Sequence, residues 1–104
     1  MIDVKFTEPA EHDLVMIEHY IHVELCNPIS AENLVRGIIE RAKSLAKFPK
    51  RHPFANDELL RRLGIRLTWF ENYNIFYVYD EENNVVNILR VLYDRQDWKN
   101  LLIP

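Results

Sequence analysis

The sequence predicts a small α+β domain with an N-terminal strand and an antiparallel helical hairpin packed on one face of a small antiparallel sheet. Two amphipathic stretches, 8–26 and 30–47, are separated by only a few residues, and strand-like segments follow one another in the last third. With 104 residues, 48% of them hydrophobic and 28% charged, the chain is expected to form a single domain spanning 1–104. The hairpin would leave the opposite face of the sheet free, and we expect function there.

The N-terminal part predicts one strand and one helix. Residues 2–6 alternate between apolar and polar side chains, which is the period of a half-buried strand. Thr7 is a suitable N-cap for a helix over 8–26, and Asn27-Pro28 would end it. The helix prediction depends on an apolar stripe at spacings of three and four, formed by Ala10, Leu14, Ile17, Ile21 and Leu25.

A second helix is predicted over 30–47, with Ser30 as its cap and Pro49 at its end. Its apolar stripe consists of Leu34, Ile38, Ala42 and Leu45. Gly37 lies inside this helix, where glycine is unfavourable, and a close approach of the first helix would explain it. Residues 49–62 are polar and are expected to form a loop with a helical turn near 56–60.

Three strands are predicted over 65–70, 73–79 and 85–93, because β-branched and aromatic residues dominate segments bounded by Asn, Asp or Gly. Residues 94–102 would form a short final helix or a loose tail. Regular alternation in the last strand would place Val85, Asn87, Leu89, Val91 and Tyr93 on one face and Val86, Ile88, Arg90 and Leu92 on the other. A shared surface carrying Arg66 and Arg90 is geometrically possible, and a carboxylate such as Asp94 or Asp97 could instead hold Arg90.

Charge is unevenly distributed along a chain whose net charge is −3. Up to position 35 there is one basic residue against seven acidic ones, whereas positions 36–66 contain nine basic residues against three acidic ones. This asymmetry indicates either a cationic surface for an acidic partner or phosphates, or a solvated helix face followed by a charged loop.

The composition predicts no metal site and no cofactor. A single cysteine, Cys26, excludes an internal disulfide and a cysteine-rich metal centre. His19 and His22 have a spacing of three, and with Glu18 and His12 they lack the pattern of a zinc site. His52 beside Arg51 is an isolated general-base candidate. No apolar run is long enough to span a membrane, and the N-terminus does not resemble a signal peptide, so a cytoplasmic protein is expected.

Short motifs along nearly the whole chain resemble the RelE/ParE superfamily of bacterial toxins, the toxic halves of type II toxin–antitoxin pairs. They are EPAEHDL at 8–14 with Ile17 and Tyr20, LAKFP at 45–49, LGIR at 63–66, YNIFYV at 73–78 and ILRVLYDRQD at 88–97. The last motif resembles the ending of ParE-type toxins most closely.

The resemblance implies a toxin that inhibits growth, takes part in plasmid stabilisation and forms a hetero-oligomer with a cognate antitoxin. Asn74 stands where RelE-type ribonucleases carry arginine, and Leu92 stands where histidine is common in both branches. The incomplete set favours ParE-like binding and inhibition of DNA gyrase without chemistry. The alternative is a ribosome-dependent mRNA endonuclease, with catalytic candidates Arg66, Arg90, Tyr93 and Arg95. A non-toxic member that retains antitoxin binding is a further alternative. Partner-binding candidates are Arg66, Phe76, Arg90, Leu92 and Tyr93.

Overall fold

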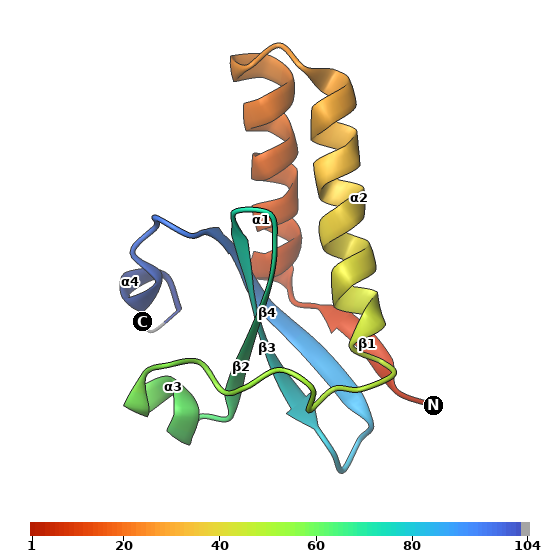
Figure 1. The fold of residues 1–104 in the computed structure, drawn as a ribbon, viewed down its shortest axis with the longest axis vertical. Helices are drawn as coiled ribbons and strands as arrows, with labels where there is room; N and C mark the ends of the chain where they lie inside the picture. The colour runs from red at the N-terminus through yellow and green to blue at the C-terminus, as the bar shows by residue number, and fades with distance from the viewer. Residues whose placement is uncertain (103–104) are drawn as a thin grey trace.

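A computed structural model describes residues 1–102 and confirms the predicted α+β class (Figure 1). The elements in chain order are β1 (Asp3–Phe6), α1 (Glu8–His19), a π-helical turn η1 (Tyr20–Glu24), α2 (Pro28–Ser44), α3 (Glu58–Arg62), β2 (Ile65–Phe70), β3 (Tyr73–Asp80), β4 (Val85–Tyr93) and α4 (Trp98–Leu102). The helices α1 and α2 form a long hairpin that rises from the sheet. No helix within residues 1–102 is long and apolar enough to cross a membrane.

The sheet has the strand order β1-β4-β3-β2 and is mixed, so the prediction of a wholly antiparallel sheet is wrong in one pairing. β2, β3 and β4 form an antiparallel meander, whereas β1 runs parallel to β4, from Asp3 opposite Val85 to Phe6 opposite Ile88. The two helices between β1 and β2 return the chain to its starting end, so β2 runs in the direction of β1. After two tight reversals β4 has that direction again.

The ends of the hairpin helices follow local capping chemistry. The Thr7 hydroxyl accepts a hydrogen bond from the Ala10 amide at 3.4 Å, as the sequence predicted. The second helix begins earlier than predicted, because Asn27 Oδ1 accepts from the Ser30 amide at 3.1 Å and Pro28 occupies the first turn. Ser30 is therefore a residue of the first turn, and the prediction that it caps α2 is wrong.

Gly37 gives α2 room against the sheet rather than against the first helix. A Cβ atom at position 37 would overlap the ring of Phe70, which comes from the end of β2. Arg41, one turn along the same helix, places its guanidinium carbon 5.9 Å from the centre of that ring. The predicted close approach is thus present, but its partner is β2 and not α1.

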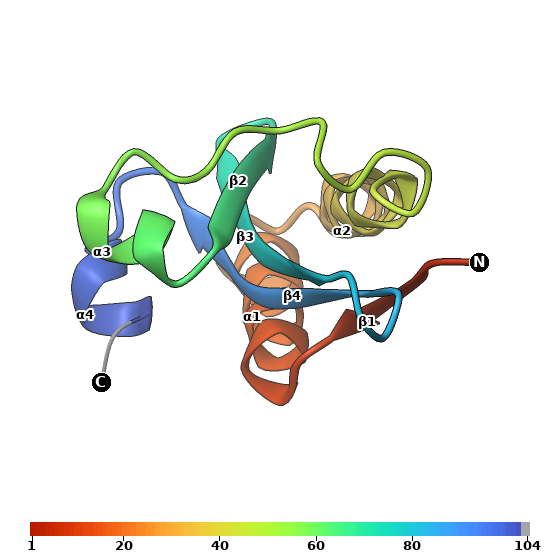
Figure 2. The same cartoon turned by 90° about the horizontal axis from the view of Figure 1, so that it is seen from below.

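Both faces of the sheet are covered, which corrects the prediction of a free face. The helix side is closed by a core that includes Ile38, Leu45, Ile75, Tyr77 and Ile88. The other side carries a second apolar cluster of Ala55, Leu60, Ile65, Phe76 and Leu92, with Trp98 and Leu102 packed against it. Figure 2 shows that α3 and α4, which supply Leu60, Trp98 and Leu102, lie next to each other at one end of the sheet. Because the sequence of 49–62 is mostly polar, it did not predict that this segment covers the sheet.

A β-bulge in β4 explains why the predicted alternation fails. Phe76 faces Arg90 and the next residue, Tyr77, faces Ile88, so Leu89 has no partner on β3. The extra residue exchanges the two faces of the rest of β4. Val91 consequently packs in the helix-side core, and Leu92 joins the opposite cluster.

Candidate functional site

A hollow lined by aromatic and apolar residues lies between the helical hairpin and the ends of β3 and β4. It has a volume of about 690 Å³, and we call it the tyrosine groove. Its helical wall includes Met16, Tyr20, Leu25 and Leu34, and its sheet wall includes Tyr73 and Tyr93, with Gln96 from the turn after β4. Met16, Tyr20 and Leu25 are each more than half exposed. Exposed apolar side chains gathered in one concave place indicate a surface for a protein partner.

Two tyrosines form the sheet wall of the groove. The rings of Tyr73 and Tyr93 meet edge to face with centres 5.4 Å apart. Burial raises the pKa of the Tyr73 hydroxyl above its usual value of 10.0, and the neighbouring Tyr93 and Tyr20 hydroxyls add to this effect. Tyr73 therefore stays protonated at neutral pH, where it can donate a hydrogen bond to a partner but cannot act as a base.

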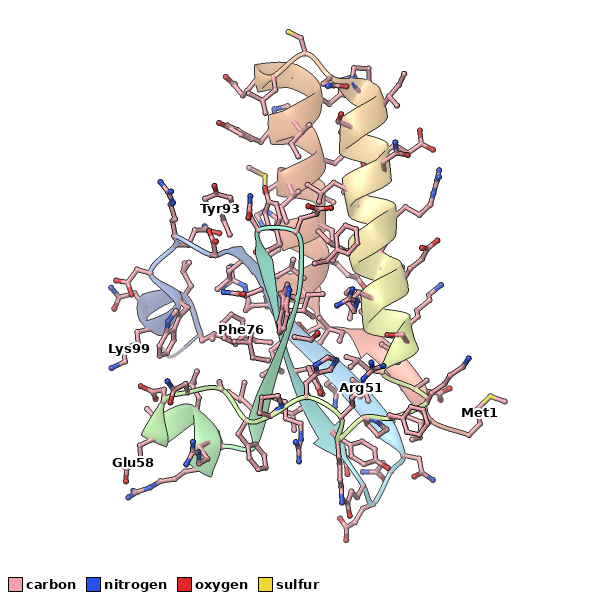
Figure 3. All side chains as sticks on the ribbon, in the orientation of Figure 1. Met1, Arg51, Glu58, Phe76, Tyr93 and Lys99 are labelled. Atoms are coloured by element: carbon pink, nitrogen blue, oxygen red, sulfur yellow. The ribbon has the colours of Figure 1, made fainter. Side chains whose placement is uncertain are left out.

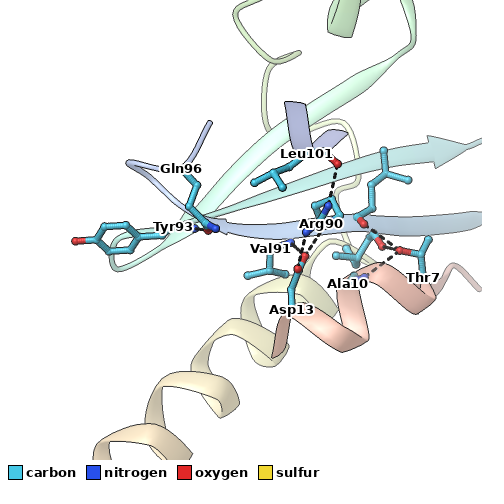
Figure 4. Close-up of polar contacts among 10 residues, drawn as sticks. Thr7, Ala10, Asp13, Arg90, Val91, Tyr93, Gln96 and Leu101 are labelled. Atoms are coloured by element: carbon cyan, nitrogen blue, oxygen red, sulfur yellow. Dashed lines mark hydrogen bonds and ion pairs between the residues drawn. The ribbon is translucent and has the colours of Figure 1, made fainter. Parts of the chain in front are cut away.

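Arg90 is fixed in a clamp with Asp13 of α1 (Figure 4). Its Nε donates to Asp13 Oδ2 and its Nη2 donates to Asp13 Oδ1, both at 2.7 Å. Asp13 Oδ2 also accepts from the Val91 amide at 3.0 Å, and Arg90 Nη1 donates to the Leu101 carbonyl at 2.8 Å. The bonds to Asp13 raise the pKa of Arg90 against the opposing effect of burial. Arg90 is thus a structural residue that joins α1, β4 and α4.

The carboxylate that pairs with Arg90 is Asp13, and not Asp94 or Asp97 as the sequence suggested. Sequence reasoning missed Asp13, although its position carried a signal. It lies three residues after Ala10 and four before Ile17, which places a carboxylate on the buried face of the helix. A buried carboxylate requires a partner.

Arg66 occupies a different part of the molecule. Its Nη1 donates to the His52 carbonyl at 2.7 Å and to the Lys50 carbonyl at 3.4 Å, and its guanidinium lies 4.1 Å from the centre of the Phe54 ring. Arg66 faces Tyr77 across β2 and β3, whereas Arg90 faces the preceding residue of β3, Phe76. Because successive residues of a strand point to opposite faces, the shared surface that alternation made possible for the two arginines does not form.

Two further partner-binding candidates are buried. Phe76 is 2% exposed and Leu92 is 1% exposed, both within the cluster that α3 and α4 cover. A partner cannot reach them while this cover is in place. Of the residues that the sequence proposed, Tyr93 and Arg95 remain exposed, and Tyr93 lines the tyrosine groove.

The histidines form no metal site, since residues 1–102 contain no group of three or more His, Cys, Asp or Glu side chains suited to a metal ion. His12 and His19 of α1, His22 of η1 and Cys26 are all exposed. His52 stands apart from them. Its ring meets Trp69 edge to face at 6.4 Å, and burial, then the cations of Arg51 and Arg41, lowers its pKa.

The pKa of His52 is expected to lie below the ordinary value of 6.5 and to rise in an Arg51→Ala variant. Since the unfolded chain then binds a proton more readily than the folded one, stability contributed at this site should fall as the pH drops through about 6.5. NMR titration of the ring measures the pKa, and unfolding of a His52→Gln variant at pH 5.5 and 7.5 measures the linkage. If the ring had a pKa of 6.5 and this pKa did not change in the Arg51→Ala variant, the assigned cause would be wrong.

Together these features define a small α+β domain with an aromatic groove, in which two of the catalytic candidates, Arg66 and Arg90, are held outside the groove that Tyr93 lines. The sequence model of the family described as the ParE toxin of the type II toxin–antitoxin system parDE matches residues 4–98. The chain therefore belongs to the ParE toxin family.

Solved structures support this assignment. The chain is similar to a protein of the chromosomal ParDE toxin–antitoxin system from P. aeruginosa, with a TM-score of 0.72 and 25% identity over 89% of this chain and 96% of that one. It is also similar to a chain of the toxin–antitoxin complex RelBE2 from Mycobacterium tuberculosis, with a TM-score of 0.65 and 26% identity over 88% of this chain and 90% of that one. No curated protein sequence matches the chain.

Proposed function

We propose that this protein is the toxin of a type II toxin–antitoxin pair, that it inhibits DNA gyrase by binding, and that a cognate antitoxin neutralises it. The observation that supports binding over RNA cleavage is that two of the ribonuclease candidates, Arg66 and Arg90, are held by other groups outside the groove of Tyr93. Cleavage through a 2′-hydroxyl requires a base, an acid and cations around one phosphate. Arg90 is held by Asp13, and Arg66 is held by two loop carbonyls. Neither lines the groove that contains Tyr93.

The tyrosine groove is the proposed docking site. An antitoxin segment that folds on binding would cover Met16, Tyr20 and Tyr93, which are exposed in the free toxin. Both solved relatives come from toxin–antitoxin systems. If gyrase is recognised through the same exposed tyrosine surface, an antitoxin in the groove neutralises the toxin by competition.

The two activities can be separated with purified protein. Supercoiling by gyrase and the integrity of mRNA on translating ribosomes would be measured with the wild type and with a Tyr93→Phe variant. We expect supercoiling to be blocked and the mRNA to remain intact. Codon-positioned cuts that disappear in Tyr93→Phe but persist in the hydroxyl control Tyr79→Phe would establish the ribonuclease instead. An absence of both effects, with antitoxin binding retained, would identify a non-toxic member.

Docking in the groove is tested by a matched pair of neighbouring substitutions. Met16→Glu places a charge in the groove, whereas Val15→Glu places the same charge on an exposed residue outside its lining. We expect Met16→Glu to weaken antitoxin binding at least tenfold, because an unpaired carboxylate would be desolvated in an apolar contact. Val15→Glu should bind as the parent does. Equal effects of the two variants would show that the groove is not the docking site.

A further inference from the structure

A second groove, of about 670 Å³, lies beside the segment that follows α2. Figure 3 places its residue Arg51 far from Tyr93, toward the N-terminal Met1. We call it the cationic groove. Its apolar wall is formed by Ile2, Phe48, Pro49 and Tyr79, and its charged rim by Lys47, Lys50, Arg51 and Glu81.

Hydrogen bonds from the sheet hold the loop that forms this groove in place. The Tyr77 hydroxyl donates to the Pro49 carbonyl at 2.9 Å, and Arg66 donates to the Lys50 and His52 carbonyls. The Leu67 amide donates to the next carbonyl along the loop, that of Pro53, at 3.2 Å. Donors from the sheet thus bind four carbonyls of one loop. A segment fixed in this way loses little conformational entropy when a partner binds.

The outer surface of the same loop is apolar and positively charged. Phe48 is 66% exposed, which is unusual for a phenylalanine. Lys47 and Arg51 have no carboxylate within ion-pair distance among residues 1–102, whereas Arg36 and Arg62 pair with glutamates one turn away on their own helices. Lys50 pairs with Glu81, and both side chains are more than half exposed. Such an exposed pair is weak, so an incoming carboxylate can displace Glu81.

This combination suits an acidic peptide better than a nucleic acid. Carboxylates can reach the lysines and Arg51 on the rim while an apolar side chain of the peptide packs against Phe48 and Tyr79. Tight polynucleotide binding uses roughly 6–10 phosphate contacts, and this groove offers three cations beside the carboxylate of Glu81. The net charge of −3 also repels a long polyanion more than a short acidic segment.

We infer that the cationic groove binds an acidic segment of the antitoxin that carries an apolar anchor residue. The inference rests on the proposed function, and it adds a second contact surface on the toxin that is separate from the tyrosine groove. Because the two grooves lie apart, one antitoxin chain occupying both gains affinity through effective concentration.

The test uses toxin co-expressed with the small reading frame that is expected to abut its gene and to encode the antitoxin. The double variant Lys47→Glu/Arg51→Glu is compared with the control Lys43→Glu/Arg61→Glu, which changes net charge equally at exposed positions outside the groove. We expect the groove variant to bind the antitoxin about 10- to 100-fold more weakly and to lose much of its salt dependence. Phe48→Ala should weaken binding about tenfold with the salt dependence kept.

Each contrary result has a distinct meaning. Unchanged antitoxin affinity in both groove variants, with equal melting temperatures, would overturn the inference and leave the proposed function intact. If the groove variants lost gyrase inhibition but kept their antitoxin affinity, the groove would bind gyrase, and the inference would again be overturned. The wild type and the control variant could bind a single-stranded oligothymidylate that the groove variant does not bind. With antitoxin affinity unchanged, this result would show that the cationic groove is a nucleic-acid site. A wild-type toxin that forms no complex with the neighbouring gene product would overturn the proposed function and the inference together.

Discussion

Replacing Asp13 with alanine is expected to lower the free energy of unfolding by about 3–5 kcal/mol, as when one partner of a buried ion pair is removed. Asp13 is 8% exposed and accepts three hydrogen bonds, two from Arg90 and one from the Val91 amide. The variant leaves a guanidinium and a backbone amide without their acceptor in a largely buried place. Urea denaturation followed by circular dichroism measures the change.

The matched control is Glu58→Ala, which removes the partner of Arg62 from an exposed pair one helical turn apart. Its expected effect is below about 1 kcal/mol. An Asp13→Ala variant as stable as this control would show that the clamp contributes little to stability. If Arg90→Ala kept the stability of the parent but abolished toxicity, Arg90 would be a functional residue and its structural assignment here would be wrong.

Replacing Leu45 with aspartate is expected to unfold the domain. Leu45 is 1% exposed at the end of α2 and belongs to the helix-side core. Removing a buried leucine side chain costs about 2–5 kcal/mol, and burying an unpaired carboxylate adds to this loss. The sum approaches the total stability of a small domain, about 5–15 kcal/mol. Circular dichroism should show weak helix signal and no cooperative thermal transition.

Leu63→Asp is the control for this substitution, because Leu63 is 55% exposed. It should melt close to the parent. The melting temperature of Leu14→Asp should lie between those of the two variants, since Leu14 is half-buried and packs against the core without being part of it. A cooperative transition of Leu45→Asp near the parental temperature would show that the buried stripe of α2 has been misassigned.

The elements of this fold could be predicted from local chemistry, whereas their partners often could not. The Thr7 cap and the apolar stripes depend on neighbours within one helical turn, and the structure confirms them except at Leu25, which is 57% exposed after the helix ends. The parallel pairing of β1 and the contact of Gly37 with Phe70 depend on residues far apart in the chain. Periodicity carries no information about such contacts.

The candidate site was harder to predict because one extra residue, Leu89, changes which side chains of β4 face the helices. Strict alternation placed Arg90 and Leu92 on the face of Val86, and the bulge at Leu89 reverses this assignment. A bulge leaves no local signal when, as here, its residue is a leucine rather than a glycine. Tyr93 could be identified from the family resemblance, but the groove around it needs the helical hairpin in place.

The parallel pairing of β1 with β4 also has a consequence for synthesis of the protein on the ribosome. β1 leaves the ribosome first, yet its sheet partner follows some eighty residues later, since Asp3 lies opposite Val85. At about 5–20 residues per second this delay lasts several seconds. During that time α1 has neither the strand it packs against nor Arg90 to neutralise Asp13. A chain released before β4 is made therefore cannot complete the sheet, and prematurely terminated products of the gene are expected to be unfolded and harmless.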